Sequence, residues 1–443
     1  MNKNSLNLDF GNYMNRSIKK SSIELSESIK NESSVESYDS LNFEIANISE
    51  SYIENAIRQM FNRKGSSNTY INDHPDFKDL VHNGESINQY ICPLFIDIRG
   101  STRLGLVYPL EFVRDFKNAV IRMCIEVVRA FDGYVHRIMG DAVLAFFGSS
   151  SISKEQAIID TLNAVCILDF LLLNSVRPYL ESTNPDFEAN SHFGFRIGIN
   201  FGNEDQVLWS NYGYGKAGEV SATGFPIDVA AKLQGLADKN TTMLGQGLLH
   251  EINFPKNFST IKLDKDSNPM KFVKPNYTIK GTPINYNMRI LDRNEYMKGL
   301  FISTEAKEKL FPNEIKSNSI FTLNVSHRNG GAKYPFFPHT VVPKNHEIII
   351  TVTATYTEIF GKRFKVYFEK INNVGENNES SFVDDYTKNG LNEILAFQEI
   401  NSNNLTATFK RDCTFRGIHR VKCSITDWDN KVVYSELINI PIM

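Results

Sequence analysis

Cysteine is scarce in this chain, and its distribution does not suggest pairing. Five cysteines are scattered over 443 residues, and an odd number favours reduced thiols in the cytoplasm over a disulfide framework. An excess of one charge is also missing, since 48 basic and 51 acidic residues leave a net charge of -3. This balance excludes a general attraction to nucleic acid. The first residues lack the basic-then-apolar pattern of a signal peptide.

Long hydrophobic runs are absent as well. The most apolar stretch, residues 164–173, is short and is interrupted by Asp169, so we expect a buried helix and no direct insertion into a membrane. The apolar fraction of 41% is ordinary for a globular protein. A chain of this length has enough apolar material for two or three domains. Together, these features indicate a soluble cytoplasmic protein.

The first two thirds of the chain predict a leader, an extension and an α/β domain. Residues 1–47 are rich in Ser, Asn and charge, which is typical of a disordered or loosely docked leader. Residues 48–86 are expected to form a helical N-terminal extension. Between 87 and 292, apolar strand-like runs alternate with helical periodicity, which predicts an α/β domain. Its helices are expected at 109–130, 154–180 and 226–236.

The last third of the chain has a different pattern. After an expected linker at 293–316, residues 317–443 contain short alternating or β-branched runs separated by Asn-Gly, Asn-Asn and Asp-Asn signals. This pattern is typical of antiparallel strands. We therefore expect an all-β sandwich of immunoglobulin-like size at the C-terminus.

Two aspartates stand where predicted strands run into turns. Asp97 lies near the end of the apolar run 90–98, and Asp141 follows Gly140 in a hairpin dipeptide. A strand end fixes a carboxylate, and glycine lets a phosphate or metal approach the backbone closely. Two hard oxygen donors suit Mg2+, which usually takes carboxylates plus substrate phosphates. Metal-assisted chemistry on a nucleoside triphosphate is expected, the alternative being that the aspartates only cap their turns.

Four segments in the expected α/β domain resemble the catalytic domain of the class III nucleotidyl cyclases. One alone would be a weak signal, but four in the family's order are specific. The resemblance covers about residues 87–290 and implies a ferredoxin-like βαββαβ core. The segments are Phe95–Thr102 (Phe-x-Asp-Ile-x-Gly-Ser-Thr), Arg137–Ala142 (Arg-x-x-Gly-Asp-Ala), 196–200 (Arg-Ile-Gly-Ile-Asn) and 228–232 (Asp-Val-Ala-Ala-Lys).

The resemblance assigns metal and phosphate roles. It implies that Asp97 and Asp141 hold two Mg2+ or Mn2+ ions per site, with the carbonyl of Ile98 as a further ligand. Lys216 and Lys280 fall near places where the family uses cations on the triphosphate, although each alone is equally typical of a surface lysine. Backbone amides for the phosphates would come from Gly100, Ser101 and Thr102.

In this family a second subunit completes each active site, so the resemblance implies a homodimer with composite sites. The transition-state pair is usually Asn and Arg, four residues apart on a helix, and here Asp228 and Lys232 stand in their places. Lys232 supplies a point charge without the bidentate fork of arginine. Asp228 accepts hydrogen bonds but cannot donate as Asn does. An exposed helical salt bridge, or a nucleotide-binding regulator that no longer turns over, remains an alternative.

The positions that read the base depart from the purine enzymes. Adenylyl cyclases of this class have Lys and Asp where this chain has Arg137 and Ser221, and the Glu and Cys pair associated with guanine is also missing. Arg137 only donates hydrogen bonds, which suits a base edge rich in carbonyl oxygens. UTP is therefore favoured over CTP. The alternatives are an adenylate or guanylate cyclase and, for Arg137 itself, a strand residue paired with an acid.

The C-terminal strands carry a second resemblance. The run Cys413–Cys423, followed by Ser435, is similar to the C-terminal sensor domain associated with adenylyl/guanylyl cyclases and SMODS proteins. A cyclase with this sensor resembles the pyrimidine cyclases of bacterial Pycsar anti-phage systems. That resemblance implies a cyclic pyrimidine nucleotide that acts through a separately encoded, cyclic-nucleotide-responsive effector. A zinc site around His419 is not expected, because closely spaced ligand pairs are missing.

Overall fold

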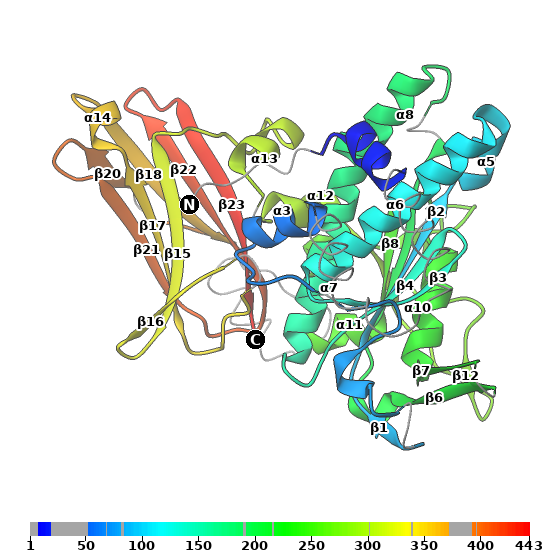
Figure 1. Ribbon diagram of the computed structural model, residues 1–443. Helices are drawn as coiled ribbons and strands as arrows, with labels where there is room; N and C mark the ends of the chain where they lie inside the picture. Colours follow the sequence, from blue (N-terminus) through cyan, green and yellow to red (C-terminus); the bar gives the residue numbers. More distant parts are fainter. Residues whose placement is uncertain are drawn as a thin grey trace, which may run out of the picture.

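The protein has two regions that lie side by side, an α/β region and a β-rich region (Figure 1). Helices α12 (Arg293–Lys298) and α13 (Thr304–Leu310) lie between them. This description comes from a computed structural model, which describes residues 8–18, 52–67, 69–80, 84–188, 192–214, 217–300, 302–337, 340–371, 392–395 and 397–443.

A seven-stranded sheet in the order β3-β4-β2-β5-β8-β14-β9 forms the centre of the α/β region. Helix α6 (Leu110–Ala130) follows β2, and α7 (Lys154–Leu171) follows β4. The order β3-β4-β2-β5 with these two helices is that of a ferredoxin-like βαββαβ core. The strands are β2 (Cys92–Arg99), β3 (Tyr134–Met139), β4 (Ala142–Phe147), β5 (Gly194–Ile199), β8 (Thr241–Gly245), β9 (Ser259–Thr260) and β14 (Met288–Leu291).

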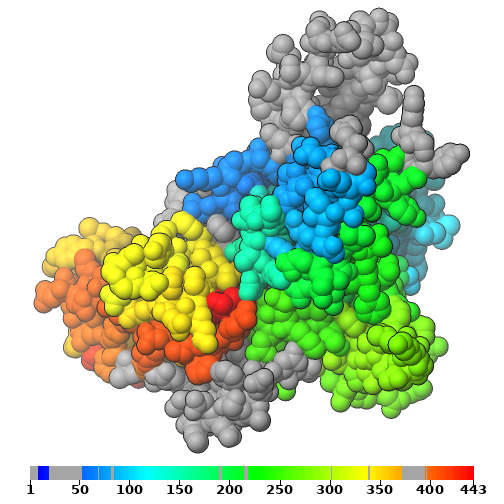
Figure 2. All heavy atoms as spheres, turned by 90° about the horizontal axis from the view of Figure 1, so that it is seen from below, coloured from blue at the N-terminus to red at the C-terminus, as the bar shows by residue number. Residues whose placement is uncertain are grey.

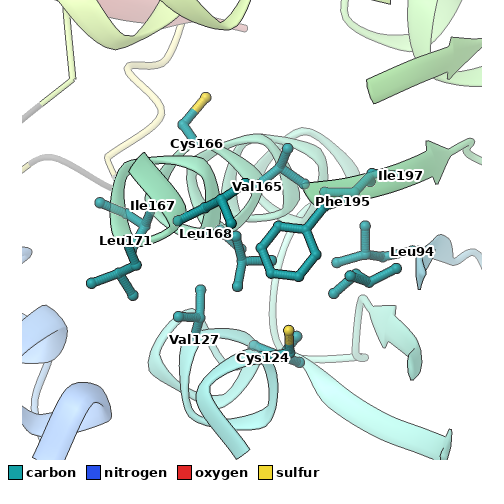
Figure 3. Close-up of a cluster of buried hydrophobic side chains, with 14 of the residues drawn as sticks. Leu94, Cys124, Val127, Val165, Cys166, Ile167, Leu168, Leu171, Phe195 and Ile197 are labelled. Atoms are coloured by element: carbon teal, nitrogen blue, oxygen red, sulfur yellow. The ribbon is translucent and has the colours of Figure 1, made fainter. Parts of the chain in front are cut away.

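Helices α6 and α7 cover one face of this sheet. Val127 of α6 and Leu168 of α7 meet Leu94 and Phe195 of the strands in one apolar cluster (Figure 3). The helical stretch Lys154–Thr183 is long and apolar enough to cross a membrane, but 89% of its most apolar window is buried inside the protein, as in a core helix. The helix expected at 154–180 in fact continues from α7 through a π-helical turn (Leu172–Val176) into α8 (Arg177–Thr183).

The other face of the sheet carries α10 (Phe225–Leu236) and the hairpin β6 (Leu208–Tyr214)–β7 (Ala217–Thr223). Helix α10 approaches β5 so closely that a Cβ on Gly198 would lie 2.3 Å from the carbonyl oxygen of Ala230. Glycine at this point therefore permits the helix to lie directly on the strand. The hairpin packs on β4 and β2 through a smaller apolar cluster.

The N-terminal segments pack against the α/β region instead of forming a disordered or loosely docked leader. A helix over 10–18 buries Phe10 and Tyr13 in the main core, and α3 (Tyr52–Met60) packs on α6. Glu126 of α6 accepts hydrogen bonds from the Tyr13 hydroxyl at 2.8 Å and from the Ile53 amide at 2.7 Å. The leader prediction is therefore wrong for residues 8–18, and the rest of 1–47 lies outside the described residues.

The β-rich region consists of two antiparallel sheets around one apolar core. One has the order β16-β15-β17-β21, and the other has β19-β18-β22-β23 with β20 also paired to β18. This confirms a two-sheet arrangement, while its immunoglobulin-like character stays a prediction. The strands are β15 (Phe321–Asn329), β16 (Ala332–Pro335), β17 (Glu347–Ala354), β18 (Arg363–Ile371), β19 (Asn392–Ile394), β20 (Gln398–Asn401), β21 (Thr406–Asp412), β22 (Gly417–Asp427) and β23 (Val432–Ile442).

The segment 293–316, expected to be a linker, is instead structured by α12 and α13 and packs against the sandwich. Lys307 of α13 pairs with Glu436 of β23 at 3.1 Å, and both side chains are buried. Arg420 of β22 pairs with Glu295 of α12 at 3.0 Å. Figure 2 shows the yellow-to-red sandwich directly against the cyan and green α/β region. The linker prediction for 293–316 is therefore wrong, because charged side chains of this segment are partnered across the joint.

All five cysteines are free and buried, as expected for reduced thiols. Several short elements complete the described chain. The remaining elements are β1 (Ser86–Asn88), α5 (Ser101–Val107), α11 (Gln246–Glu251), β10 (Lys262–Leu263), β11 (Pro269–Met270), β12 (Thr278–Ile279), β13 (Thr282–Pro283), α14 (Tyr356–Ile359) and the 3-10 turns Pro75–Phe77, Glu204–Gln206 and Lys256–Phe258.

Candidate active site

Strand register brings the two predicted metal aspartates together. Asp97 of β2 lies opposite Ala142 of β4, and the Ile98 amide donates to the carbonyl oxygen of Asp141 at 3.3 Å. Gly140 adopts a positive φ of 66° and allows the tight turn that ends at Asp141. Asp97 therefore has Asp141 beside it at the end of the β2–β4 pair, as the sequence predicted.

Each carboxylate has one polar side-chain partner from a neighbouring element. Arg196 lies opposite Asp97 on β5, and its Nε donates to the Asp97 carboxylate at 2.8 Å. The hydroxyl of Ser101 donates to the carboxylate of Asp141. Asp97 is partly exposed, with 16% of its side-chain surface accessible. Both acids are thus held in place at a surface that a ligand can reach.

These donors fit a hard divalent cation. Two carboxylates and a nearby backbone carbonyl at Ile98 are oxygen ligands, the type that Mg2+ and Mn2+ prefer. No group of three or more His, Cys, Asp and Glu side chains within the described ranges could hold a metal by itself. The remaining ligands would have to be water and substrate phosphate, which is how Mg2+ is usually bound in nucleotide sites.

The turn after β2 lies against this pair. Gly100 adopts a φ of +90°, and a Cβ there would lie 1.8 Å from the carbonyl oxygen of His192, so only glycine fits. Ser101 is buried and Thr102 is exposed at the start of α5. The contact from Ser101 to Asp141 places the predicted phosphate turn next to the predicted metal site.

The predicted base-reading residues form a second cluster. Arg137 of β3 pairs with the carboxylate of Glu219 on β7. The Oγ of Ser221 lies 3.2 Å from Nε2 of His136, and this same Nε2 lies 4.0 Å from the Glu219 carboxylate. The register of β3 shifts between Val135 and Arg137, and this bulge lets both His136 and Arg137 reach β7. The alternative that Arg137 pairs with an acid is confirmed.

His136 is the buried member of this cluster. Burial lowers the pKa of its imidazole to about 4, and the charge of Arg137 contributes to the shift. The ring is therefore neutral near pH 7. Arg137 is far more open, with 46% of its side-chain surface exposed. The cluster thus presents an exposed ion pair backed by a neutral, buried imidazole.

The transition-state positions lie on α10. Asp228 is exposed, and the ammonium of Lys232 lies 4.8 Å from the centre of the Tyr277 ring. Burial and the Asp228 carboxylate raise the pKa of Tyr277. Within the described chain no ion pair joins Asp228 to Lys232, so the alternative of a helical salt bridge is not formed. Lys280 is exposed in the turn between β12 and β13, and Lys216 lies outside the described residues.

Sequence reasoning missed three residues of these clusters. Arg196 was recognised only as part of a motif, and Glu219 and His136 were not singled out. Alternation along 217–223 does put Glu219 on the strand face of Ser221. Nothing in the sequence, however, predicts the strand pairing that brings β7 to Arg137, because hairpin folding over β3 depends on the apolar cluster beneath it.

Solved cyclase structures resemble about half of the chain. The adenylyl cyclase CyaB from P. aeruginosa is 17% identical, covers 47% of this chain and 95% of its own, and has a TM-score of 0.35. The guanylyl cyclase Cya2 is 16% identical, covers 47% of this chain and 93% of its own, and has a TM-score of 0.36. No protein-family model matches the chain.

Curated relatives match nearly the whole chain. A cytidylate cyclase of Escherichia coli is 35% identical over 411 residues, 90% of this chain and 88% of that protein. A cytidylate cyclase of Staphylococcus aureus is 30% identical over 383 residues, 85% of this chain and 84% of that protein. The match spans the sheet with Asp97 and Asp141 as well as the sandwich. The chain is a nucleotidyl cyclase and belongs to the family of these cytidylate cyclases.

Proposed function

We propose that the chain converts CTP into 3',5'-cyclic CMP and pyrophosphate. The observation that carries this proposal is the 35% identity, over 90% of the chain, to a protein named cytidylate cyclase. The lack of purine-reading residues at Arg137 and Ser221 supports it. The preference for UTP gives way to CTP, because it rested on Arg137 as an isolated donor, whereas Arg137 is paired with Glu219.

The reaction is an internal displacement at the α-phosphorus. The ribose 3'-oxygen bonds to the α-phosphorus, the bond to the β-phosphate oxygen breaks, and the 3'-hydroxyl proton is lost to solvent. Asp97 and Asp141 would hold two Mg2+ or Mn2+ ions, whose charge acidifies the 3'-hydroxyl and neutralises the leaving pyrophosphate. Arg196 and Ser101 orient these two carboxylates. The turn at Gly100 would hold the phosphates.

Two copies of the chain are proposed to form composite sites. The metal acids of one protomer would act with Lys232 and Asp228 of its partner, Lys232 placing positive charge by the α-phosphate and Asp228 accepting a ribose hydroxyl. Exposed apolar side chains near these positions support a second copy here, since such groups are typical of interfaces. They include Ile138, Met139, Tyr212 and Phe225.

The cyclic nucleotide is proposed to be a second messenger in anti-phage defence, read by a separately encoded effector in the cytoplasm. The union of a cyclase with a C-terminal sandwich in one chain supports this role. A silent nucleotide-binding regulator is the second candidate, because Asp228 and Lys232 replace the usual Asn and Arg.

Pyrophosphate release separates the two candidates. The full chain is incubated with CTP and Mn2+, and pyrophosphate is measured with a coupled assay, with Asp97→Ala as the inactive control. We expect release by the wild type and none by the variant. Nucleotide binding without pyrophosphate in the wild type would favour the silent regulator and overturn the cyclase proposal.

A further inference from the structure

Glu219, the acidic member of the ion pair with Arg137, lies in the wall of a cavity. Glu219 lines a cavity of about 300 Å³ together with the rings of Tyr134, His136 and Trp209. This volume lies at the lower end of ligand pockets in proteins. It suits a ligand part as small as a single pyrimidine ring, and the ring-lined walls suit a flat aromatic group.

The charged groups around the cavity are few and paired. Asp73 and Lys78 line the cavity and pair with each other at 3.2 Å. His136 is neutral near pH 7, because burial and then the charge of Arg137 lower its pKa to about 4. The pair of Glu219 and Arg137 thus sets an acceptor beside several donors, and 23% of the Glu219 side chain and 46% of the Arg137 side chain are exposed.

Such a pair has a definite hydrogen-bonding order. The Glu219 carboxylate accepts, and the Arg137 guanidinium has five N–H donors, so that bonding to Glu219 leaves others for a ligand. The order along the pair is acceptor, donor, donor. The Watson–Crick edge of cytosine offers the complement, a donor amine at N4 followed by acceptors at N3 and O2. Acidic side chains read the N4 amine of cytosine in nucleic acids by the same bond.

Uracil does not match this order. Its edge has a carbonyl at position 4, an N–H at position 3 and a carbonyl at position 2. Placing uracil on the pair would set the Glu219 carboxylate against the carbonyl oxygen at position 4, so that two acceptors would face each other without a proton between them. Arg137 alone favours carbonyl-rich edges, but the pair reverses this preference.

We infer that Glu219, held by Arg137, is a specificity-determining residue that accepts the cytosine amine and so selects CTP over UTP. The inference rests on the proposed function and names the residue that sets its substrate. His136 acts as a positioning residue, because its Nε2 contacts Ser221 at 3.2 Å and lies 4.0 Å from the Glu219 carboxylate. Neither Glu219 nor His136 lies at a position where the purine enzymes read their base.

A competition assay with Glu219→Gln tests the inference. The amide keeps an acceptor and adds a donor, so it can face either the amine of cytosine or the carbonyl of uracil. Full-length wild type and variant are incubated with equal CTP and UTP, and the ratio of cyclic CMP to cyclic UMP is measured by mass spectrometry. We expect the ratio to fall by about tenfold or more in the variant. The product ratio does not depend on how much of the variant is folded.

Glu204→Gln is the matched control. Glu204 pairs with Lys154 at 2.7 Å on the surface of the same region and takes no part in the cluster. Its product ratio should equal that of the wild type. An unchanged ratio in Glu219→Gln, or cyclic UMP as the main wild-type product, would overturn the role of Glu219.

Failure of the cyclase proposal gives a different result. In that case no cyclic nucleotide forms, and binding of CTP and UTP is compared by calorimetry in wild type and Glu219→Gln. A tenfold loss of CTP over UTP selectivity on substitution would still support the inference. Equal selectivity in the two proteins would overturn it. The turnover and binding measurements thus separate the two claims.

Discussion

At the residue scale, the site depends on acids that a neighbour already holds in place. Arg196 donates a hydrogen bond to Asp97, and Ser101 donates one to Asp141. Both acids stand where the sequence predicted them, because a strand end followed by glycine is a local signal. Glu219 could not be predicted in the same way, since its partner Arg137 is distant in sequence and is reached only through the hairpin.

Removing either metal acid should abolish turnover and leave the fold intact. Asp97→Ala or Asp141→Ala takes away one of two oxygen ligands for the cations. Arg196, the partner of Asp97, has 25% of its side-chain surface exposed, so the loss of Asp97 leaves no fully buried charge. Activity on CTP and circular dichroism should show a folded, inactive protein. An unchanged rate in either variant would remove that acid from the site.

At the element scale, long periodic helices were predicted well and docked segments poorly. The helix expected at 109–130 is α6 (Leu110–Ala130), because its apolar spacing is local. The helix over 10–18 was missed since its burial depends on distant partners such as Glu126. The serine-rich composition of the N-terminal region predicted disorder, although the helix over 10–18 packs its apolar side chains on the main core.

Glu126 links this docking to pH. Burial raises the pKa of its carboxyl to about 7 in the folded protein, against about 4.3 for an unfolded glutamate. Between about pH 4.3 and pH 7, Glu126 therefore carries a proton in the folded protein that it has lost in the unfolded chain. The contribution of Glu126 to folding stability is therefore fully present below about pH 4 and is lost as the pH rises to 7, by roughly 3 kcal/mol.

Urea denaturation at pH 5 and pH 8 measures this effect. Glu126→Gln should lose a large part of the wild-type decrease in unfolding free energy between these values, because its amide does not titrate. The exposed Glu111 on the same helix provides the control, and Glu111→Gln should behave as wild type. Equal pH slopes in the wild type and Glu126→Gln would contradict the raised pKa.

At the scale of the whole molecule, the order of an α/β region before a β-rich one was predictable, and their joint was not. Near residue 313 the sequence changes from mixed helical and strand-like runs to short alternating or β-branched runs, which marks the start of the β-rich region. The helices α12 and α13 at the joint are too short to show periodicity. Their contacts with the sandwich include the buried pair Lys307–Glu436 and the partly buried pair Arg420–Glu295, which no local sequence signal identifies.

The buried pair Lys307–Glu436 should be essential to this joint. Lys307→Met leaves the Glu436 carboxylate buried without the ammonium that balances its charge, while Thr304 and Tyr434 still donate hydrogen bonds to it. Breaking such a pair costs about 3–5 kcal/mol. Urea denaturation should show that loss. Arg363→Met, which breaks an exposed pair with Glu399, should leave the midpoint unchanged, and equal midpoints for both variants would refute the role of Lys307.

Composite sites predict complementation between two inactive variants. Asp97→Ala lacks a metal acid, and Lys232→Ala lacks the transition-state charge, so a mixed dimer has one intact site. Mixing and re-equilibrating both proteins should restore roughly a quarter of the wild-type rate, because half of randomly assorted dimers are mixed. A mixture as inactive as its parts would contradict the composite site.

Identifying the product tests the central claim most directly. The purified full-length chain is incubated separately with ATP, GTP, CTP and UTP in the presence of Mn2+, and the products are identified by mass spectrometry. Cyclic CMP from CTP as the dominant product, lost in Asp97→Ala, is the predicted result. Cyclic AMP or cyclic GMP as the dominant product, or no cyclic nucleotide from any of the four substrates, would contradict it.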